Sequence, residues 1–513
     1  MERAGAGSDF LGLHAASAPA RGLTSWLAAT LRNAVLEGRL PPGTRLPPTR
    51  TLSADLGIAR GVAVEAYQRL VDEGLLTARP GRGTEVLPLG REPGPRSTHA
   101  QQPDPSGTGV PRLPVAPTDQ VEPAAYDLSP GVPDLAAFPR AAWLRAERSV
   151  LRDMTSADLG YGDPRGSPRL RAVLAGWLAT TRGVRAEPDD VLVVAGVAQA
   201  LALLAQTLRS AGRIRTAVED PGSRGACAEI AHWGMHPVPI AVDEHGLDVA
   251  QLVATGADSV LLTPAHQFPT GVVLSPARRR ALLDWATGTR LVIEDDYDAE
   301  HRYDRAPVRA LQPSAPEHVA HTGSTSKTLA PGMRLGWLVP PRHLHADLVA
   351  ARHASDLGSP ALPQLALAHL IETGEYDRHL RLVRTRQRQR RDAVLAALAE
   401  HLPHARVEGV AAGLHLLITF PGLPGDSDDV ELAAALRENG VVVHPLSWHR
   451  HRPGPPGLVL GYAAHPPDRL HDAVRRLAAV VGSGAPAPRR IGRDRMPHAP
   501  QRDARQSAKS PDA

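Results

Sequence analysis

The sequence predicts two folded units of different class: a small helix-rich unit and, after it, a large α/β unit. Residues from about Leu23 to Leu87 show one-sided helical patterns. From Tyr126 to about Val481, short apolar runs alternate with helical patterns, which is typical of a mostly parallel sheet covered by helices. The stretch from Pro88 to about Pro123 is crowded with Pro, Gly, Ser and Gln and has no periodicity, so we expect a flexible linker.

Composition sets limits on the class of protein. The 513 residues, 42% of them hydrophobic, are enough for two to three domains. We place folded domains at 15–88 and 125–482, a flexible linker at 89–124 and a disordered tail at 483–513. The net charge of +4 is too small to indicate a nucleic-acid partner by itself. One cysteine, Cys227, excludes an internal disulfide framework. Because no signal peptide or long apolar run is present, we expect a soluble cytoplasmic protein with no membrane partner.

Three helices and a hairpin are expected in the small unit. Leu23–Glu37 has its apolar residues on one side and ends at Gly38. Thr49 is expected to cap a second helix, Arg50–Leu56, and a third helix runs from about Arg60 to Glu73. The segment from Leu75 to Val86 indicates a hairpin with a Gly-rich tip. This order predicts a winged helix-turn-helix whose third helix enters the DNA major groove, with Arg60 at its N-terminal end.

The small unit also resembles the GntR-type DNA-binding domain, through Gly38–Pro47, Tyr67 and the wing residues Gly81-Arg82-Gly83-Thr84. The resemblance implies double-stranded operator DNA as the partner and DNA contacts by Arg45, Arg50, Arg60 and Arg82. Where family members commonly have Ser-Arg-Asn/Thr-Thr, this chain has Ala59-Arg60-Gly61-Val62, which loses hydroxyl contacts to phosphate. A small protein-interaction module is the alternative, since the unit carries a net charge of only about +2.

The large unit is expected to contain six central strands, Val191–Val194, Ile214–Val218, Ser259–Leu262, Leu291–Ile293, His318–Thr322 and Leu335–Val339. Expected helices include Pro168–Thr181, Ala198–Ser210 and Pro276–Ala286. A later alternation, at Leu414–Phe420, Val441–Val443 and Leu458–Tyr462, predicts a smaller α+β lobe. Trp143, Trp177 and Trp285 fall at apolar helical positions and are expected in the core.

Lysine is nearly absent from the chain: of 58 Lys and Arg residues, only Lys327 and Lys509 are lysines. Lys327 lies in a segment rich in Ser, Gly and Arg, from Ser324 to Arg334. Arginine stays protonated, whereas a desolvated lysine amine can lose its proton and form a Schiff base with an aldehyde. Pyridoxal phosphate is the usual aldehyde, and hydroxyls and an arginine suit its phosphate. The alternative is a chance surface lysine.

Other segments point to the same cofactor. Glu294-Asp295-Asp296-Tyr297 follows an expected strand, where loops build sites in open α/β sheets. A carboxylate there could keep the pyridine nitrogen protonated and Tyr297 could bind the phenolic oxygen, although a solvated acidic turn is the alternative. Ser324 and Arg334 could bind phosphate, as could backbone N–H groups near Gly196, between a strand and a helix.

The large unit resembles fold-type I aminotransferases, and its pairing with a winged helix resembles the MocR family of transcription regulators. The motifs are Tyr161–Gly166, Thr263–Gly271, Glu294–Asp298 and Ser324–Gly336, in that order. The resemblance implies a Schiff base at Lys327, Asp295 at the pyridine nitrogen and Tyr297 at the phenolic oxygen. It further implies a phosphate site that includes Ser324, Ser326, Arg334 and Gly196, and a head-to-tail homodimer in which Tyr161 enters the neighbouring subunit's site.

The chain departs from the aminotransferase pattern at several positions. Ala195 and Ala198 replace polar residues near the phosphate, and Ser223 stands where the family generally has a tyrosine that stacks on the cofactor. Gly457–Tyr462 contains no arginine to bind a substrate α-carboxylate, so an amino acid would be poorly oriented for proton abstraction. Physiological transamination is therefore disfavoured.

The sequence thus predicts a transcription regulator whose aminotransferase-like domain binds pyridoxal 5′-phosphate through Lys327 and senses an amine, an amino acid or the cofactor itself. An aminotransferase with an accessory DNA-binding module and a regulator with a decayed cofactor site remain alternatives. The basic stripe Arg381, Arg384, Arg388 and Arg391 is interpreted as a solvated helix face, with auxiliary DNA contact as the alternative. His449 and His451 have no carboxylate or Cys at ligand spacing, so no metal site is expected. Cys227 has no evident partner.

Overall fold

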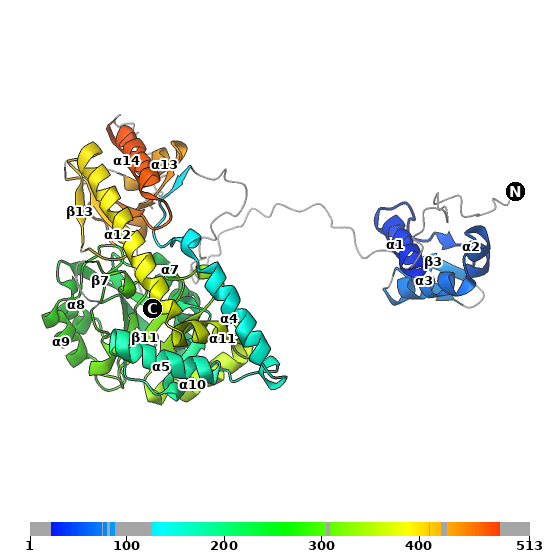
Figure 1. The fold of residues 1–513 in the computed structure, drawn as a ribbon, viewed down its shortest axis with the longest axis horizontal. Helices are drawn as coiled ribbons and strands as arrows, with labels where there is room; N and C mark the ends of the chain where they lie inside the picture. Colours follow the sequence, from blue (N-terminus) through cyan, green and yellow to red (C-terminus); the bar gives the residue numbers. More distant parts are fainter. Residues whose placement is uncertain are drawn as a thin grey trace, which may run out of the picture. The chain divides into compact units, whose positions relative to one another are not determined.

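The computed structural model describes residues 22–73, 75–79, 83–87, 125–303, 308–409, 411–421 and 428–482. Contacts divide the chain into two compact units, Met1–Gly107 and Thr108–Ala513 (Figure 1). Each unit buries a hydrophobic core of its own. Within the described ranges, no helix combines the length and hydrophobicity that crossing a membrane requires.

The small unit consists of three helices and a three-stranded antiparallel sheet of order β1-β3-β2. Its elements are α1 (Leu23–Leu36), β1 (Arg45–Leu46), α2 (Thr49–Asp55), α3 (Arg60–Asp72), β2 (Leu76–Arg79) and β3 (Gly83–Val86). Leu27, Leu31 and Leu70 are buried between the helices. The Tyr67 hydroxyl donates a hydrogen bond of 2.9 Å to the Pro47 carbonyl and so fixes the chain before α2 on α3. The winged helix-turn-helix is confirmed.

The start of α2 differs from the prediction. Thr49 is the first helical residue and does not cap the helix; Pro48 occupies the cap position, with φ −55° and ψ 141°, and no side chain caps α2. Proline has no side-chain acceptor, so no side chain at this position binds the N–H groups of the first turn. The short strand β1, which pairs with the wing strand β3, was not predicted either.

The large unit is built around an eight-stranded sheet of order β5-β12-β11-β10-β9-β6-β7-β8. Its strands are β5 (Leu192–Val194), β6 (Arg215–Asp220), β7 (His236–Asp243), β8 (Gly246–Leu247), β9 (Ser259–Leu262), β10 (Leu291–Asp295), β11 (Val319–Ser324) and β12 (Gly336–Val339). Strands β7, β6, β9, β10 and β11 are parallel, whereas β12 and β8 are antiparallel to their neighbours. The mostly parallel sheet and its six expected strands are confirmed.

Strand β7 was missed because Pro237 and Pro239 argue against a strand. Both prolines pair with β6 on one side. On the other side, β8 pairs only with Val242 and Asp243, beyond the prolines. Over Pro237 and Pro239 the strand is therefore the edge of the sheet, where a missing N–H donor leaves no neighbour unpaired.

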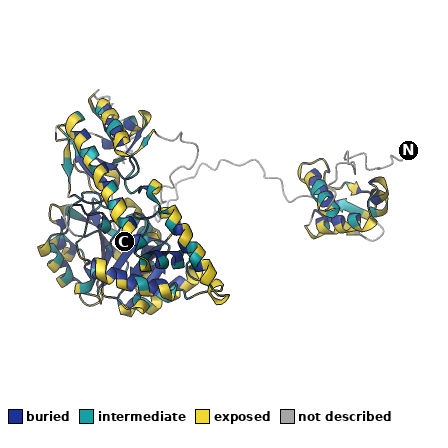
Figure 2. Cartoon of the chain, in the orientation of Figure 1, coloured by how far each residue is buried: buried dark blue, intermediate teal, exposed yellow. Residues whose placement is uncertain are grey.

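Helices cover both faces of the sheet (Figure 1). They are α4 (Arg140–Asp153), α5 (Pro168–Arg182), α6 (Val197–Ser210), α7 (Arg224–His232), α8 (Val249–Ala254), α9 (Pro276–Trp285), α10 (Arg342–Asp356) and α11 (Ala361–Glu372). The core with α6, α7 and α10 and the core with α8 and α9 contact different strand residues. The strands β9, β11 and β12 are entirely buried, while outer helix faces are exposed (Figure 2). Trp143, Trp177 and Trp285 are buried as predicted.

A smaller α+β lobe completes the unit, as predicted. It contains β13 (Arg406–Glu408), β14 (His415–Thr419), β16 (His444–Pro445) and β17 (Gly457–Gly461) in an antiparallel sheet, the parallel pair β4 (Tyr126–Asp127) and β15 (Val441–Val442), and the helices α13 (Asp429–Glu438) and α14 (Pro467–Gly482). Helix α12 (Glu375–His401), 27 residues long, joins the two parts. Tyr376 lies in a core of the large sheet, whereas Leu398 lies in the core of the lobe.

Candidate functional site

A cavity of about 540 Å³ lies where β9, β10 and β11 end. Because these strands are parallel, the loops that follow them meet at one edge of the sheet. Six of the eight residues predicted for a cofactor site line this cavity: Asp295, Tyr297, Ser324, Ser326, Lys327 and Arg334. Gly131, Phe268 and His415 also line it and were not predicted to do so.

The amine of Lys327 is half-buried, and its Nζ donates a hydrogen bond of 2.6 Å to the Gly131 carbonyl. Gly131 has φ +88°, a conformation that favours glycine, and a Cβ there would lie 3.0 Å from this Nζ. Burial lowers the pKa of Lys327 from its ordinary value, against the opposing charges of Asp298 and Asp295. A lower pKa leaves more of the amine neutral and able to attack a carbonyl carbon.

Asp295 faces the cavity as an acceptor with an unmet hydrogen bond. Its Oδ1 is buried and, among the described residues, has no hydrogen-bond partner. Burial first, and then the charges of Asp296 and Asp298, raise the pKa of Asp295 to about 7. A buried carboxylate without a donor is costly, so this position favours a ligand that brings an N–H group.

The other acidic residues of this segment have partners inside the protein. Glu294 accepts hydrogen bonds from the Leu311 N–H at 2.8 Å and from His321 at 3.2 Å. Asp296 binds Arg182 through two contacts of 2.5 and 2.8 Å. Since Glu294, Asp296 and Asp298 are all buried, the interpretation as a solvated acidic turn is wrong. Asp295 alone of the four acidic residues lines the cavity.

The opposite end of the cavity is suited to an anion. Arg334 lines it, and its guanidinium also donates to the Ala195 carbonyl. Gly196 lies behind this guanidinium, since a Cβ there would be 3.3 Å from both Arg334 terminal nitrogens. Helix α6 begins at the next residue, and its first-turn N–H groups have no acceptor within the helix. Ala198 also lines the cavity and, as predicted from the sequence, offers no polar group there.

Tyr161 lies away from this cavity, whereas Ser223 lines it. Tyr161 is 92% exposed and is not part of the described cavity wall. Ser223 lies between this cavity and a second one of about 440 Å³, and the two also share Asp295 and Thr263. The Ser223 hydroxyl accepts from the Ala226 N–H at 3.3 Å and so caps α7. A helix cap therefore stands where the resemblance expects a stacking ring.

The α-carboxylate clamp of aminotransferases has no counterpart on β17. Val459 is fully buried and packs with Leu417 and Leu446. Within the described lining of the cavity, Arg334 is the only arginine, and it lies at the anion-binding end.

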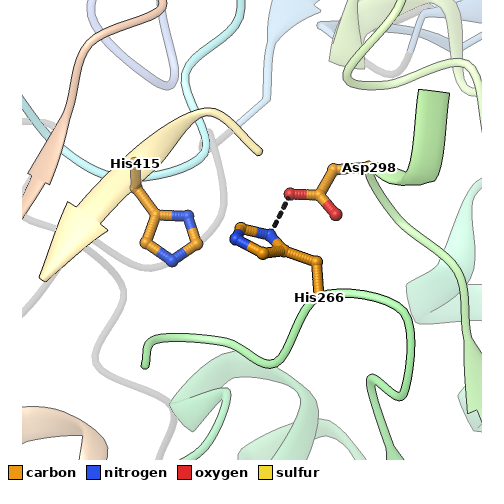
Figure 3. A group of neighbouring side chains, drawn as sticks. All are labelled: His266, Asp298 and His415. Atoms are coloured by element: carbon orange, nitrogen blue, oxygen red, sulfur yellow. Dashed lines mark hydrogen bonds and ion pairs between the residues drawn. The ribbon is translucent and has the colours of Figure 1, made fainter. Parts of the chain in front are cut away.

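A buried cluster behind the cavity, His266, Asp298 and His415, was not predicted (Figure 3). The His266 Nδ1 lies 2.9 Å from the Asp298 Oδ2. The His415 Nε2 donates to the Pro269 carbonyl at 3.2 Å. One ligand atom from each of the three side chains lies within 4.8 Å of the others. The protein partners account for the burial of these side chains without an ion. Sequence could have flagged His266 and Asp298, since both lie inside motifs already noted.

Other side chains also have partners that sequence did not reveal. The Cys227 Sγ lies 3.5 Å from the Nε2 of His451, so the expectation that Cys227 lacks a histidine partner is wrong. His449 contacts His444, with 3.3 Å between ring nitrogens. The absence of a metal site at His449 and His451 stays a prediction.

Three of the four arginines predicted to contact DNA are exposed side chains of the small unit. Arg45 on β1, Arg50 in α2 and Arg60 at the start of α3 are exposed, and none forms an ion pair with a described residue. By contrast, Arg32, Arg39 and Arg69 are each paired with a glutamate. Arg82 lies outside the described residues. The unpaired guanidinium groups on the predicted DNA face are available for phosphates and bases.

Comparisons with known proteins agree with both units. Residues 126–477 match the family model "Aminotransferase class I and II", and residues 23–86 match "Bacterial regulatory proteins, gntR family". The chain is 33% identical over 470 residues to the probable rhizopine catabolism regulatory protein MocR of Rhizobium meliloti, covering 89% of this chain and 94% of that one. The chain belongs to the MocR family of transcription regulators.

Further comparisons support this membership in the MocR family. The pyridoxine biosynthesis transcriptional regulator PdxR of Corynebacterium glutamicum is 31% identical over 462 residues, 89% of this chain and 96% of that one. Among solved structures, LysN, an α-aminoadipate aminotransferase of Thermus thermophilus, matches with a TM-score of 0.62 and 26% identity over 70% of this chain and 92% of that one. This MocR-family chain is thus a DNA-binding regulator with a fold-type I aminotransferase-like domain.

Proposed function

We propose that this regulator holds pyridoxal 5′-phosphate on Lys327 and uses the site to sense a small amine, an amino acid or the cofactor itself. The observation that carries the proposal is the cavity in which a half-buried lysine amine occurs together with the Asp295 Oδ1, which has no hydrogen-bond partner among the described residues. The matching aminotransferase family model and the solved aminotransferase LysN belong to a class of proteins that depends on this cofactor. The regulator PdxR, named for pyridoxine biosynthesis, supports the cofactor as a signal.

The residues present suit the cofactor. Asp295 would accept a hydrogen bond from the ring nitrogen and so satisfy its buried Oδ1. Tyr297 would donate to the phenolic oxygen, and Arg334, Ser324, Ser326 and the α6 N-terminus behind Gly196 would bind the phosphate. Bound there, pyridoxal phosphate supplies a carbonyl carbon that captures amines and a ring that withdraws electrons.

Ligand sensing is favoured over transamination. Val459 offers a buried aliphatic side chain where an aminotransferase needs a guanidinium. Without that contact, an amino acid captured at Lys327 is not held in the orientation that proton abstraction needs. The unpartnered Asp295 also favours a retained cofactor site over a decayed one, despite Ala195, Ala198 and Ser223.

We further propose that the regulator acts in the cytoplasm as a head-to-tail homodimer that presents two winged helices to an operator. The 92% exposure of Tyr161 supports a role for this side chain outside its own cavity. A dimer that completes each site with the partner's tyrosine would link ligand binding to the arrangement of the DNA-binding units.

The experiment measures DNA affinity by fluorescence anisotropy, with the full-length chain and a duplex selected from a random pool. We expect addition of pyridoxal phosphate, or of amines and amino acids to the loaded protein, to change the dissociation constant by about 5-fold or more. A ligand must bind two domain arrangements with different affinity to cause such a change. An unchanged dissociation constant across the cofactor and the whole panel would contradict sensing, while leaving DNA binding intact.

A further inference from the structure

Two histidines and a glutamate meet where the C-terminal end of α12 packs on α14. Glu400 and His401 are the last two residues of α12, and His471 lies in the second turn of α14. The Glu400 Oε2 is 3.4 Å from the His471 Nε2, and the Glu400 Oε1 is 3.6 Å from the His401 Nε2. One ligand atom from each of the three side chains lies within 4.8 Å of the others. The three side chains therefore form one compact cluster at the surface of the lobe.

The packing of the two helices places these side chains together. Helices α12 and α14 lie side by side (Figure 1), and Leu398 of the first and Leu470 of the second are buried in the same core. His401 follows Leu398 by three residues and so lies on the same face of α12, while His471 directly follows Leu470. The hydrophobic core of the lobe therefore brings the two histidines together, whether or not an ion is bound.

One ring nitrogen of this cluster is not used by the hydrogen bonds of the protein. The His401 Nε2 is buried and has no hydrogen-bond partner among the described residues. Glu400 and His471 already form a hydrogen bond with each other, so an ordinary surface pair would not need His401. A buried ring nitrogen without a partner is unfavourable, and a metal ion can satisfy it by taking the lone pair of the neutral imidazole.

We propose that Glu400, His401 and His471 bind one divalent ion of the zinc class. Two imidazole nitrogens and one carboxylate oxygen are a ligand set that zinc takes, with water at the fourth position, whereas calcium and magnesium prefer oxygen ligands. Zinc lies about 2.0–2.2 Å from such ligands, so two ligand atoms of one ion are at most about 4.4 Å apart. The pairs at 3.4 and 3.6 Å meet this limit. The Glu400 and His471 side chains are 63% and 42% exposed, so they can turn toward an ion without disturbing the core.

An ion at this position would fasten the end of α12 to α14. Helix α12 joins the part of the unit around the large sheet to the lobe, and its C-terminal end lies in the lobe. An ion that binds only the folded arrangement of the two helices stabilises that arrangement. The regulator would thus carry a metal-dependent contact in addition to the proposed cofactor site.

The test measures zinc binding by full-length protein that carries no histidine tag and has been freed of metal with a chelator. Zinc is titrated in competition with a chromogenic chelator, which gives the number of ions per chain and the dissociation constant. We expect one ion per chain, bound at micromolar zinc. We also expect zinc to raise the Tm of the wild-type protein, because the ion binds the folded state.

His471→Gln and Glu400→Gln each remove one ligand from an exposed position. Without zinc, both variants are therefore expected to unfold at the wild-type temperature. Each is expected to weaken zinc binding by about 10-fold or more, since even residues that only support a metal ligand contribute about 10- to 100-fold. The rise in Tm with zinc is expected to be lost as well. His343→Gln is the matched control, because His343 is an exposed histidine of α10 outside the cluster.

The outcomes are distinguishable. Weakened zinc binding in both cluster variants, with wild-type affinity in His343→Gln, supports the proposal. Wild-type affinity in His471→Gln and Glu400→Gln, or an equal loss in His343→Gln, overturns it and indicates an adventitious ion only. A wild-type protein that binds no zinc overturns it as well. None of these results depends on the proposed cofactor, since the cluster shares no residue with the described lining of the cavity around Lys327.

Discussion

Substitution of Arg60 by alanine is expected to weaken operator binding by about 1–3 kcal/mol, roughly 5- to 150-fold. Arg60 is the first residue of α3 and is exposed, and no described side chain forms an ion pair with it. Residues at the N-terminal end of the recognition helix are those that contact base edges in this class of domain. Anisotropy with the selected duplex at one fixed salt concentration measures the change.

Arg69 provides the matched control for Arg60. It lies on the same helix and is also exposed, but its Nε is 3.2 Å from the Glu65 carboxylate. Arg69→Ala is expected to leave DNA affinity within about 0.5 kcal/mol of wild type. Equal losses in Arg60→Ala and Arg69→Ala would indicate a general electrostatic effect and contradict specific contact by Arg60. The salt dependence adds detail, because loss of a phosphate contact lowers its slope by about one.

Replacement of Arg182 by methionine is expected to destabilise the large domain by about 3–5 kcal/mol. The Arg182 side chain is 2% exposed, and it binds both oxygens of Asp296 and also the Val308 carbonyl, at 2.6 Å. Its loss leaves the buried Asp296 carboxylate without its counter-charge, next to Asp295 at the cavity. Urea unfolding followed by tryptophan fluorescence reports on this domain, which contains six of the seven tryptophans.

The ion pair between Arg169 and Glu372 is the control for this stability prediction. Its side chains are 41% and 36% exposed, so water screens the pair. Arg169→Met is expected to cost about 0–1 kcal/mol. A similar loss of stability in Arg169→Met and Arg182→Met would contradict the importance given to burial of the Arg182–Asp296 pair.

The order of elements in the small unit could be predicted because Gly and Pro punctuate it. Gly38 and Gly57 both adopt positive φ, as expected for the turns that end its first two helices. The start of α2 could not be predicted from the same pattern, because Thr49 suggests a cap but is itself the first helical residue, directly after Pro48. In the large unit, apolar runs predicted six strands, but the prolines hid β7, whose edge position only the fold reveals.

In the candidate site, too, some residues could be predicted from the sequence and some contacts could not. Lys327, Asp295 and Arg334 could be predicted because each lies in a compact motif beside a strand. The Gly131 carbonyl that binds Lys327 lies 196 residues earlier, and the His266–Asp298 pair depends on a glycine from the lobe. Contacts of this kind need the relative placement of distant segments, which periodicity and motif spacing do not contain. The second cavity behind Ser223 likewise follows from packing of α7.

The most direct test of the account is the visible absorption spectrum of full-length protein loaded with pyridoxal phosphate and freed of excess cofactor. The only other lysine, Lys509, gives a matched control. The account predicts a visible band, attributable to the cofactor bound at Lys327, in wild type and in Lys509→Ala, and its loss in Lys327→Ala. No band in wild type, or a band that survives in Lys327→Ala, would contradict the central claim that Lys327 holds the cofactor.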